Sequence, residues 1–127
     1  MLNPFTTHAS AALIFVACLL DAGSVVAHAV ITESSLRNQT LHPLKATRIL
    51  LNFNSGVELS LSKFDLVRKG DTHEAISIQN GSRPGQIILS VPPLAPGNYA
   101  IHYKVFAADG HLTEDVIRFS VAENPNP

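Results

Sequence analysis

The sequence predicts an all-β domain, an antiparallel sandwich of immunoglobulin-like kind. Short segments rich in β-branched and aliphatic residues recur along most of the chain, and turns containing Gly, Pro and Asn separate them. No run of helical periodicity competes with this pattern. The 127 residues suffice for one hydrophobic core but not for two independent ones, so a single site or surface must carry the function.

The expected elements are about seven strands joined by turn-rich pieces such as Asn80-Gly81-Ser82. In chain order they lie near 29–34 and at 48–53, 63–67, 74–78, 86–91, 99–106 and 116–121. Alternation within 99–106 turns Ile101 and Tyr103 toward the core and His102 outward, as a solvated strand histidine. Residues 122–127 are expected to form a flexible tail, so the predicted domain spans 28–121.

Composition excludes several classes of function. Lys and Arg number 9 against 10 Asp and Glu, a balance that gives no basic surface for nucleic acid or anionic lipid. The only cysteine is Cys18 and the only methionine is Met1, so no disulfide framework or Met-rich site for Cu(I) is expected. Any bound metal must therefore use nitrogen and oxygen ligands.

The first 27 residues are interpreted as a cleaved export signal. Residues 11–20 read AALIFVACLL, an apolar run of about ten residues where a membrane span needs roughly 20, and small residues follow it. A weak lipoprotein pattern precedes Cys18, but Phe15 fits it poorly. Cleavage after Ala27 would leave His28 as the N-terminus, cleavage two residues later would leave Val30, and residue patterns alone do not decide between them.

A constellation of three residues could bind a metal. Asp109 and His111 bracket Gly110 in a predicted turn between the last two strands, and the permissive backbone of glycine lets the two side chains converge. If His28 is the first residue, its free amine and its own imidazole Nδ1 can close a six-membered chelate ring. The second imidazole and the carboxylate oxygen then complete a nitrogen and oxygen set.

Such a set favours Cu(II). Tetragonal Cu(II) prefers planar nitrogen and oxygen ligands and stands above Zn(II) and Ni(II) in the Irving–Williams order, whereas Zn(II) prefers tetrahedral sites. Free α-amines have a reference pKa of about 7.7 to 8.0 and imidazoles one of about 6.5, so protons compete with the metal. Affinity should fall on acidification from about pH 7 to 5.

Four other polar residues weigh less. His42 precedes a proline in a turn-like stretch, and His73 is expected to be a solvated loop residue. Glu114 and Asp115 are expected to point to opposite faces as solvated charges. None of them is predicted to be a ligand.

An ordered set of motifs resembles the CopC family of periplasmic copper resistance proteins. The set covers nearly the whole chain after the signal and consists of His28-Ala29, Leu51-Asn52-Phe53-Asn54 with Val57-Glu58, Leu94-Ala95-Pro96-Gly97-Asn98-Tyr99, and Ala108-Asp109-Gly110-His111 followed by Phe119-Ser120-Val121.

The resemblance implies a Greek-key, cupredoxin-like β-sandwich or barrel and a copper function. It implies Cu(II) ligands at His28, Asp109 and His111, and it favours signal cleavage after Ala27 in the periplasm. The family's Met-rich Cu(I) loop, present only in some members, has no counterpart here, which implies a Cu(II)-only member. Departures from the family pattern, such as Tyr103 where Trp is common, affect the scaffold more than the ligands.

Three functions remain as alternatives. The first is a monomeric copper carrier or buffer without enzymatic activity, which passes copper to an inner-membrane transporter of the CopD type. The second is a histidine-brace copper mono-oxygenase, which usually needs a longer chain and an axial Tyr or Phe. The third is a metal-free immunoglobulin-like binding module, which becomes the default if the processed chain begins at Val30.

Overall fold

A computed structural model of the chain describes residues 28–123. The predicted signal segment, residues 1–27, and the last part of the predicted tail, residues 124–127, lie outside the described residues. None of the helices within residues 28–123 is long and apolar enough to cross a membrane.

The described residues form eight strands and two short 3-10 helices. In chain order these are β1 (Ile31–Ser34), η1 (Ser35–Arg37), β2 (Thr47–Phe53), η2 (Leu59–Leu61), β3 (Lys63–Arg68), β4 (Thr72–Ala75), β5 (Ser77–Asn80), β6 (Gln86–Val91), β7 (Gly97–Phe106) and β8 (Leu112–Val121).

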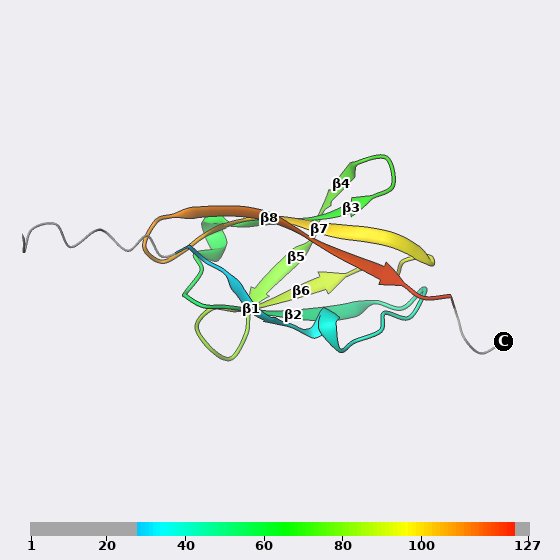
Figure 1. Cartoon of the computed structure of the whole chain (residues 1–127), viewed down its shortest axis with the longest axis horizontal. Coiled ribbons are helices and arrows are strands. Elements are labelled where there is room, and N and C mark those ends of the chain that lie inside the picture. The colour runs from blue at the N-terminus through cyan, green and yellow to red at the C-terminus, as the bar shows by residue number, and fades with distance from the viewer. Residues whose placement is uncertain (1–27, 124–127) are drawn as a thin grey trace, which may run out of the picture.

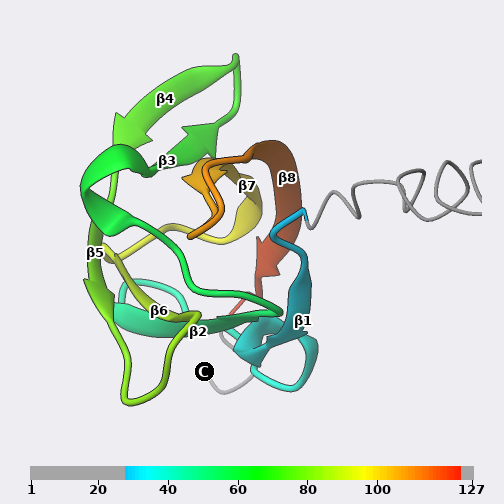
Figure 2. The ribbon, with the colours of Figure 1, turned by 90° about the vertical axis from the view of Figure 1, so that its left-hand side faces the viewer.

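The strands make two four-stranded sheets that face each other. One sheet has the order β1-β2-β6-β5 and the other the order β4-β3-β7-β8, as the end-on view in Figure 2 makes visible. Every pairing between these strands is antiparallel. The predicted all-β sandwich is therefore confirmed.

One predicted strand was wrong in an informative way. The segment at 74–78 was expected to be a single strand, but β4 pairs with β3 in one sheet and β5 pairs with β6 in the other. Ile76 lies between them, buried, and its N–H donates to the carbonyl of Phe64 at 3.0 Å. Because alternation continues through this crossing without a turn residue, the sequence pattern does not reveal the change of sheet.

The core lies between the sheets and follows strand alternation. Ile101 and Tyr103 are buried as predicted, and the Tyr103 ring stacks on Phe64 with centroids 5.7 Å apart and meets Phe53 edge-on at 5.9 Å. Burying aromatic rings of this size contributes a large share of core stability. Tyr103 thus joins residues of both sheets.

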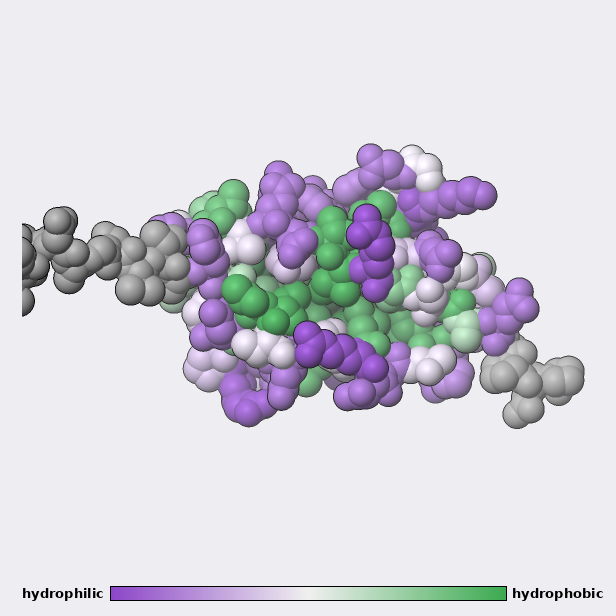
Figure 3. Space-filling view, in the orientation of Figure 1, coloured by the Kyte–Doolittle hydropathy of each residue, from purple (hydrophilic) through white to green (hydrophobic). Residues whose placement is uncertain are grey.

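The edge strands β1 and β8 border the same side of the sandwich (Figure 2). Figure 3 views this side and shows a band of hydrophobic residues between polar margins. Two large apolar side chains, Val30 and Val116, are 54% and 41% exposed there. The surface between β1 and β8 is therefore apolar. The first described residues and the β7–β8 turn meet at one end of this surface (Figure 1).

Candidate metal centre

The β7–β8 hairpin places Asp109 and His111 in one tight turn. The N–H of Ala107 donates to the carbonyl of His111 at 2.9 Å, and the N–H of Gly110 donates to the carbonyl of Ala107 at 2.9 Å. Gly110 has φ of 87°, a conformation that L side chains rarely adopt. The predicted Asp-Gly turn is therefore present, and the glycine is required by its backbone geometry.

Asp109 and His111 contact each other through two groups. Asp109 Oδ1 accepts the backbone N–H of His111 at 3.1 Å, and Asp109 Oδ2 lies 3.0 Å from His111 Nδ1. The hydrogen bond from the His111 backbone, followed by the one from its side chain, lowers the pKa of the Asp109 carboxyl. This carboxylate is held in its charged form, and Nε2 is the ring nitrogen of His111 that remains open to a metal.

His28 is positioned by the two residues that follow it. Ala29 is fully buried, and the N–H of Val30 donates to Asn54 Oδ1 at 2.9 Å while the N–H of Asn54 donates to the Val30 carbonyl at 2.9 Å. His28 itself is exposed. The chain is thus fixed immediately after His28, and its imidazole faces solvent.

The segment 54–57 connects the two halves of the candidate centre. At its start Asn54 holds Val30, and at its end the carbonyl of Gly56 accepts the N–H of Ala108 at 2.9 Å. Val57 forms an antiparallel bridge with Ala107. One loop between β2 and η2 therefore fixes both the segment after His28 and the turn that carries His111.

The structure brings the rings of His28 and His111 near each other. Their centroids are 6.2 Å apart with an interplanar angle of 68°. The donor atoms of His28, Asp109 and His111 are not all within 4.8 Å of one another. Among the described residues, only the donor atoms of Asp65, His73 and His102 lie that close together. In the full-length chain the nitrogen of His28 is a peptide nitrogen bonded to residue 27, so a free amine there requires cleavage.

Sequence reasoning missed Asn54 as a positioning residue. Asn54 follows directly after the apolar strand β2, and an asparagine at a strand end often hydrogen-bonds backbone groups through its short amide side chain. That position was the available signal. Its partner, however, belongs to a distant segment that no local pattern identifies.

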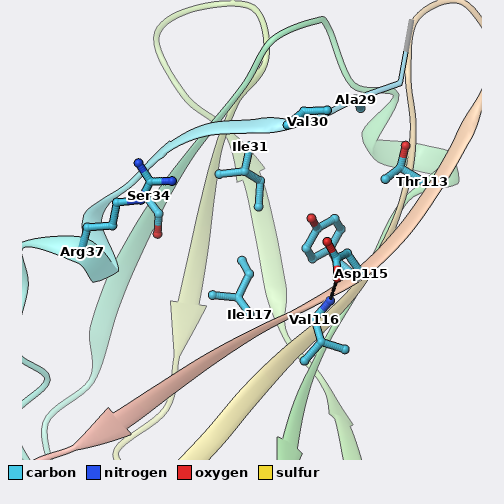
Figure 4. A pocket seen from close by; sticks show the side chains of 10 residues that line it. Ala29, Val30, Ile31, Ser34, Arg37, Thr113, Asp115, Val116 and Ile117 are labelled. Atoms are coloured by element: carbon cyan, nitrogen blue, oxygen red, sulfur yellow. Dashed lines mark hydrogen bonds between the residues drawn. The ribbon is translucent and has the colours of Figure 1, made fainter. Parts of the chain in front are cut away.

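An apolar groove runs beside the candidate centre between β1 and β8 (Figure 4). Ala29, Ile31, Val116 and Ile117 line it together with Tyr103, and its walls offer no cluster of metal ligands. Burial, and secondarily the charge of Asp115, raises the pKa of the Tyr103 phenol. The groove lies next to a polar, exposed turn, and the polar side chains of Arg37 and Asp115 are also among its lining residues.

His42 lies away from the candidate centre. Its neighbour Leu41 bridges Val121 at the C-terminal end of β8, whereas the turn with His111 precedes the N-terminal end of that strand. Ten residues of strand separate these ends, roughly 30 Å. His42 therefore cannot reach the same metal.

A second group of potential ligands lies on the outer face of the sheet β4-β3-β7-β8. Asp65, His73 and His102 each offer a donor atom within 4.8 Å of the others. Two predictions were wrong here. His73 was expected in a loop but belongs to β4. His102 was expected to be solvated but is half-buried, and its Nε2 lies 2.8 Å from Glu114 Oε1. The outward direction predicted for His102 is confirmed.

Comparisons with known proteins point to one family. Residues 31–122 match the CopC domain family. CopC from Methylosinus trichosporium OB3b is similar in structure, with 24% identity and a TM-score of 0.62 over 76% of this chain and 98% of that chain. PcoC, a methionine rich copper resistance protein from Escherichia coli, is 22% identical with a TM-score of 0.55, over 76% of this chain and 100% of that chain. No curated protein matches the chain.

Proposed function

Because the chain belongs to the CopC family of copper-binding proteins, we propose that it is an exported carrier or buffer that holds one Cu(II) ion at His28, Asp109 and His111. The observation that carries the proposal is the 6.2 Å separation between the ring centroids of His28 and His111, two residues far apart in the sequence. Copper is the cargo of this protein, and no catalysis is required.

The donor set fits Cu(II). Signal cleavage after Ala27 converts the backbone nitrogen of His28 into an amine, which with the imidazole of the same residue gives two of four ligands. The imidazole of His111 and an oxygen of Asp109 supply the others, a nitrogen-rich planar set of the kind Cu(II) prefers. All three side chains are exposed, so the rotations that bring them to one ion do not disturb the core.

The site is suited to release as well as binding. It lies on the surface with ligands from two segments, and protons compete for three of its four donors. A periplasmic, monomeric protein of this kind can load from solution and pass the ion to an inner-membrane transporter of the CopD type. An exposed rim of polar ligands beside an apolar groove provides a surface on which such a transfer can occur.

The N-terminus is the decisive test. We expect sequencing of the exported protein to begin at His28, and Cu(II) titration of that form to give one tight equivalent. A matched form that retains Ala27 keeps every side chain but moves the free amine from His28 to Ala27, which breaks the six-membered chelate ring, and its affinity should fall roughly a hundredfold, about 2.8 kcal/mol.

Two outcomes would contradict the proposal. An exported chain that begins at Val30 lacks the first ligand and supports a metal-free immunoglobulin-like module. Electron paramagnetic resonance of the copper-loaded protein should report three nitrogens and one oxygen, and a spectrum with a single weakly bound imidazole argues against this ligand set.

A further inference from the structure

We propose that Asp65, His73 and His102, here called the outer-face cluster, form a second metal site for a divalent ion of the Zn(II) or Cu(II) type. Three strands contribute to it: Asp65 lies on β3, His73 on β4 and His102 on β7. Neither the Ala27 cleavage nor the ligands of the first site are needed for it. It is therefore independent of the function proposed above.

Strand register brings the three side chains together. Asp65 pairs directly with His102 across β3 and β7, and it pairs with Ala75 of β4, two residues from His73. Side chains opposite each other, or diagonal by two residues, on one face of a sheet lie within reach. The rings of His73 and His102 accordingly meet edge-to-face with centroids 5.5 Å apart.

The carboxylate of Asp65 is the independent sign of a ligand. Its side chain is only 7% exposed although it points to the outer face, and Oδ1 has no hydrogen-bond partner. A buried carboxylate oxygen without a partner is costly, and such groups are usually satisfied by water or a cation. Nδ1 of His73 lies 3.5 Å from the other oxygen, Oδ2, so the carboxylate faces the imidazoles.

Outer carboxylates orient both imidazoles. Nε2 of His73 lies 2.9 Å from Asp71 Oδ1, and Nε2 of His102 lies 2.8 Å from Glu114 Oε1. Each contact occupies the outer ring nitrogen and leaves Nδ1 as the potential ligand. Carboxylates in this position fix the tautomer and raise the basicity of metal-bound histidines.

The chemistry of the cluster selects the kind of ion. Two imidazoles and one carboxylate suit Zn(II) and Cu(II), and no thioether or thiolate is present to favour Cu(I). Ligands around such an ion, at about 2.0 to 2.2 Å from it, lie roughly 3 to 4 Å apart, so donors already within 4.8 Å need small side-chain rotations. Three protein ligands leave one position open to water or an exchanging ligand.

Lys63 competes for the same carboxylate. Its Nζ lies 3.4 Å from Asp65 Oδ2, while its side chain is 68% exposed. An exposed lysine held by one such contact is weakly bound and easily displaced. Removing this ammonium group should therefore strengthen metal binding. If Asp65 served only the ion pair with Lys63, removing the ammonium group would not change metal binding.

The second site is separate from the first. His102 pairs with Val116 and Phe106 with Leu112, so four residues of strand, roughly 14 Å, separate the cluster from the β7–β8 turn. A protein that carries both His28→Ala and His111→Ala lacks the two imidazoles of the first site and leaves this one intact. It is the parent for the test.

Titration of this parent with Zn(II), and separately with Cu(II), should show one bound equivalent by calorimetry and metal analysis. His73→Ala changes an exposed strand residue and should weaken binding at least tenfold, and Asp65→Asn should do the same with the side-chain shape retained. His42→Ala is the matched control and should bind as the parent does. Lys63→Ala should bind more tightly than the parent.

Nuclear magnetic resonance gives a readout that does not depend on affinity. Zinc should shift the imidazole signals of His73 and His102 and leave that of His42 unchanged. A parent that binds no Zn(II) or Cu(II), or His73→Ala and His42→Ala variants with equal affinity, overturns the proposal.

Discussion

Asn54 and Val30 exchange two hydrogen bonds, one from the Val30 N–H to Asn54 Oδ1 and one from the Asn54 N–H to the Val30 carbonyl, each at 2.9 Å. The second would survive loss of the Asn54 side chain, but the first would not. The side chain of Asn54 therefore acts on the residue two places after His28 without touching a metal ligand itself.

Replacing Asn54 by Ala should weaken Cu(II) binding by about 2- to 10-fold, because one hydrogen bond is worth about 0.5 to 1.5 kcal/mol. The segment that carries His28 becomes less fixed, so more ordering is required on binding. Calorimetric titration of the form that begins at His28 measures the change. Asn54→Asp keeps the acceptor oxygen and should bind at least as tightly as the wild type; equal affinity of wild type and Asn54→Ala would contradict this role.

Copper affinity should fall as pH drops from about 7 to 5. The hydrogen bond from the His111 backbone N–H, and then the one from its side chain, lowers the pKa of the Asp109 carboxyl. This carboxylate therefore stays charged across that pH range and does not cause the loss of copper affinity. Protons instead occupy the amine and imidazole nitrogens, whose charged forms do not bind metal. Competition with a chelator at a series of pH values gives the profile.

The control for this profile is Asp109→Asn. Loss of the carboxylate should lower affinity at every pH, and affinity should still decline on acidification, because the competing protons sit on nitrogen. An affinity that does not change with pH would count against amine ligation, and a decline that disappears in Asp109→Asn would assign the titration to the carboxylate.

Local patterns predicted most of this fold. Alternation and turn residues identified the segments that became β2, β3, β6 and β7, because each of these strands has one face in the core. Of β8 they identified only residues 116–121, because its first residues, from Leu112, are exposed or only partly buried. The change of sheet at Ile76 was invisible, since a residue buried between the sheets continues the same apolar alternation.

The candidate sites divide in the same way. His28, Asp109 and His111 could be proposed because an N-terminal histidine and an Asp-Gly-His turn are local features. The cluster of Asp65, His73 and His102 could not, because it depends on the register of three strands. The sequence therefore predicts a solvated His102, whereas in the structure its ring meets that of His73.

Gly85 supports the segment that connects the two halves of the first site. A Cβ at this position would lie 2.6 Å from the Ser55 carbonyl oxygen and 2.8 Å from that of Phe53, and φ is +78°. Gly85→Ala should destabilise the domain by about 2 to 4 kcal/mol, from backbone strain and overpacking together. Denaturant unfolding measures this loss.

Gly70 provides the matched control, because it has φ of +83° and no atom within 4 Å of an added Cβ. Gly70→Ala should cost only the backbone strain, about 1 to 2 kcal/mol. If the two variants are equally destabilised, contact with the Ser55 and Phe53 carbonyls does not constrain Gly85.

Tyr103 should make the domain sensitive to alkali. Burial, with a smaller effect of Asp115, raises the phenol pKa above its ordinary value of 10.0, so the folded state favours the neutral form. The resulting stabilisation is fully present below pH 10.0 and is lost as pH rises through the folded-state pKa, because unfolding then releases a proton. Denaturant midpoints measured from about pH 8 to 12 should decline in the wild type. Tyr103→Phe keeps the ring stacked on Phe64 and should flatten part of that decline. Asp115→Asn removes the smaller cause of the raised pKa, so the decline should begin at the same pH but end at a slightly lower one. Identical profiles for wild type and Tyr103→Phe would mean that other groups control alkaline unfolding.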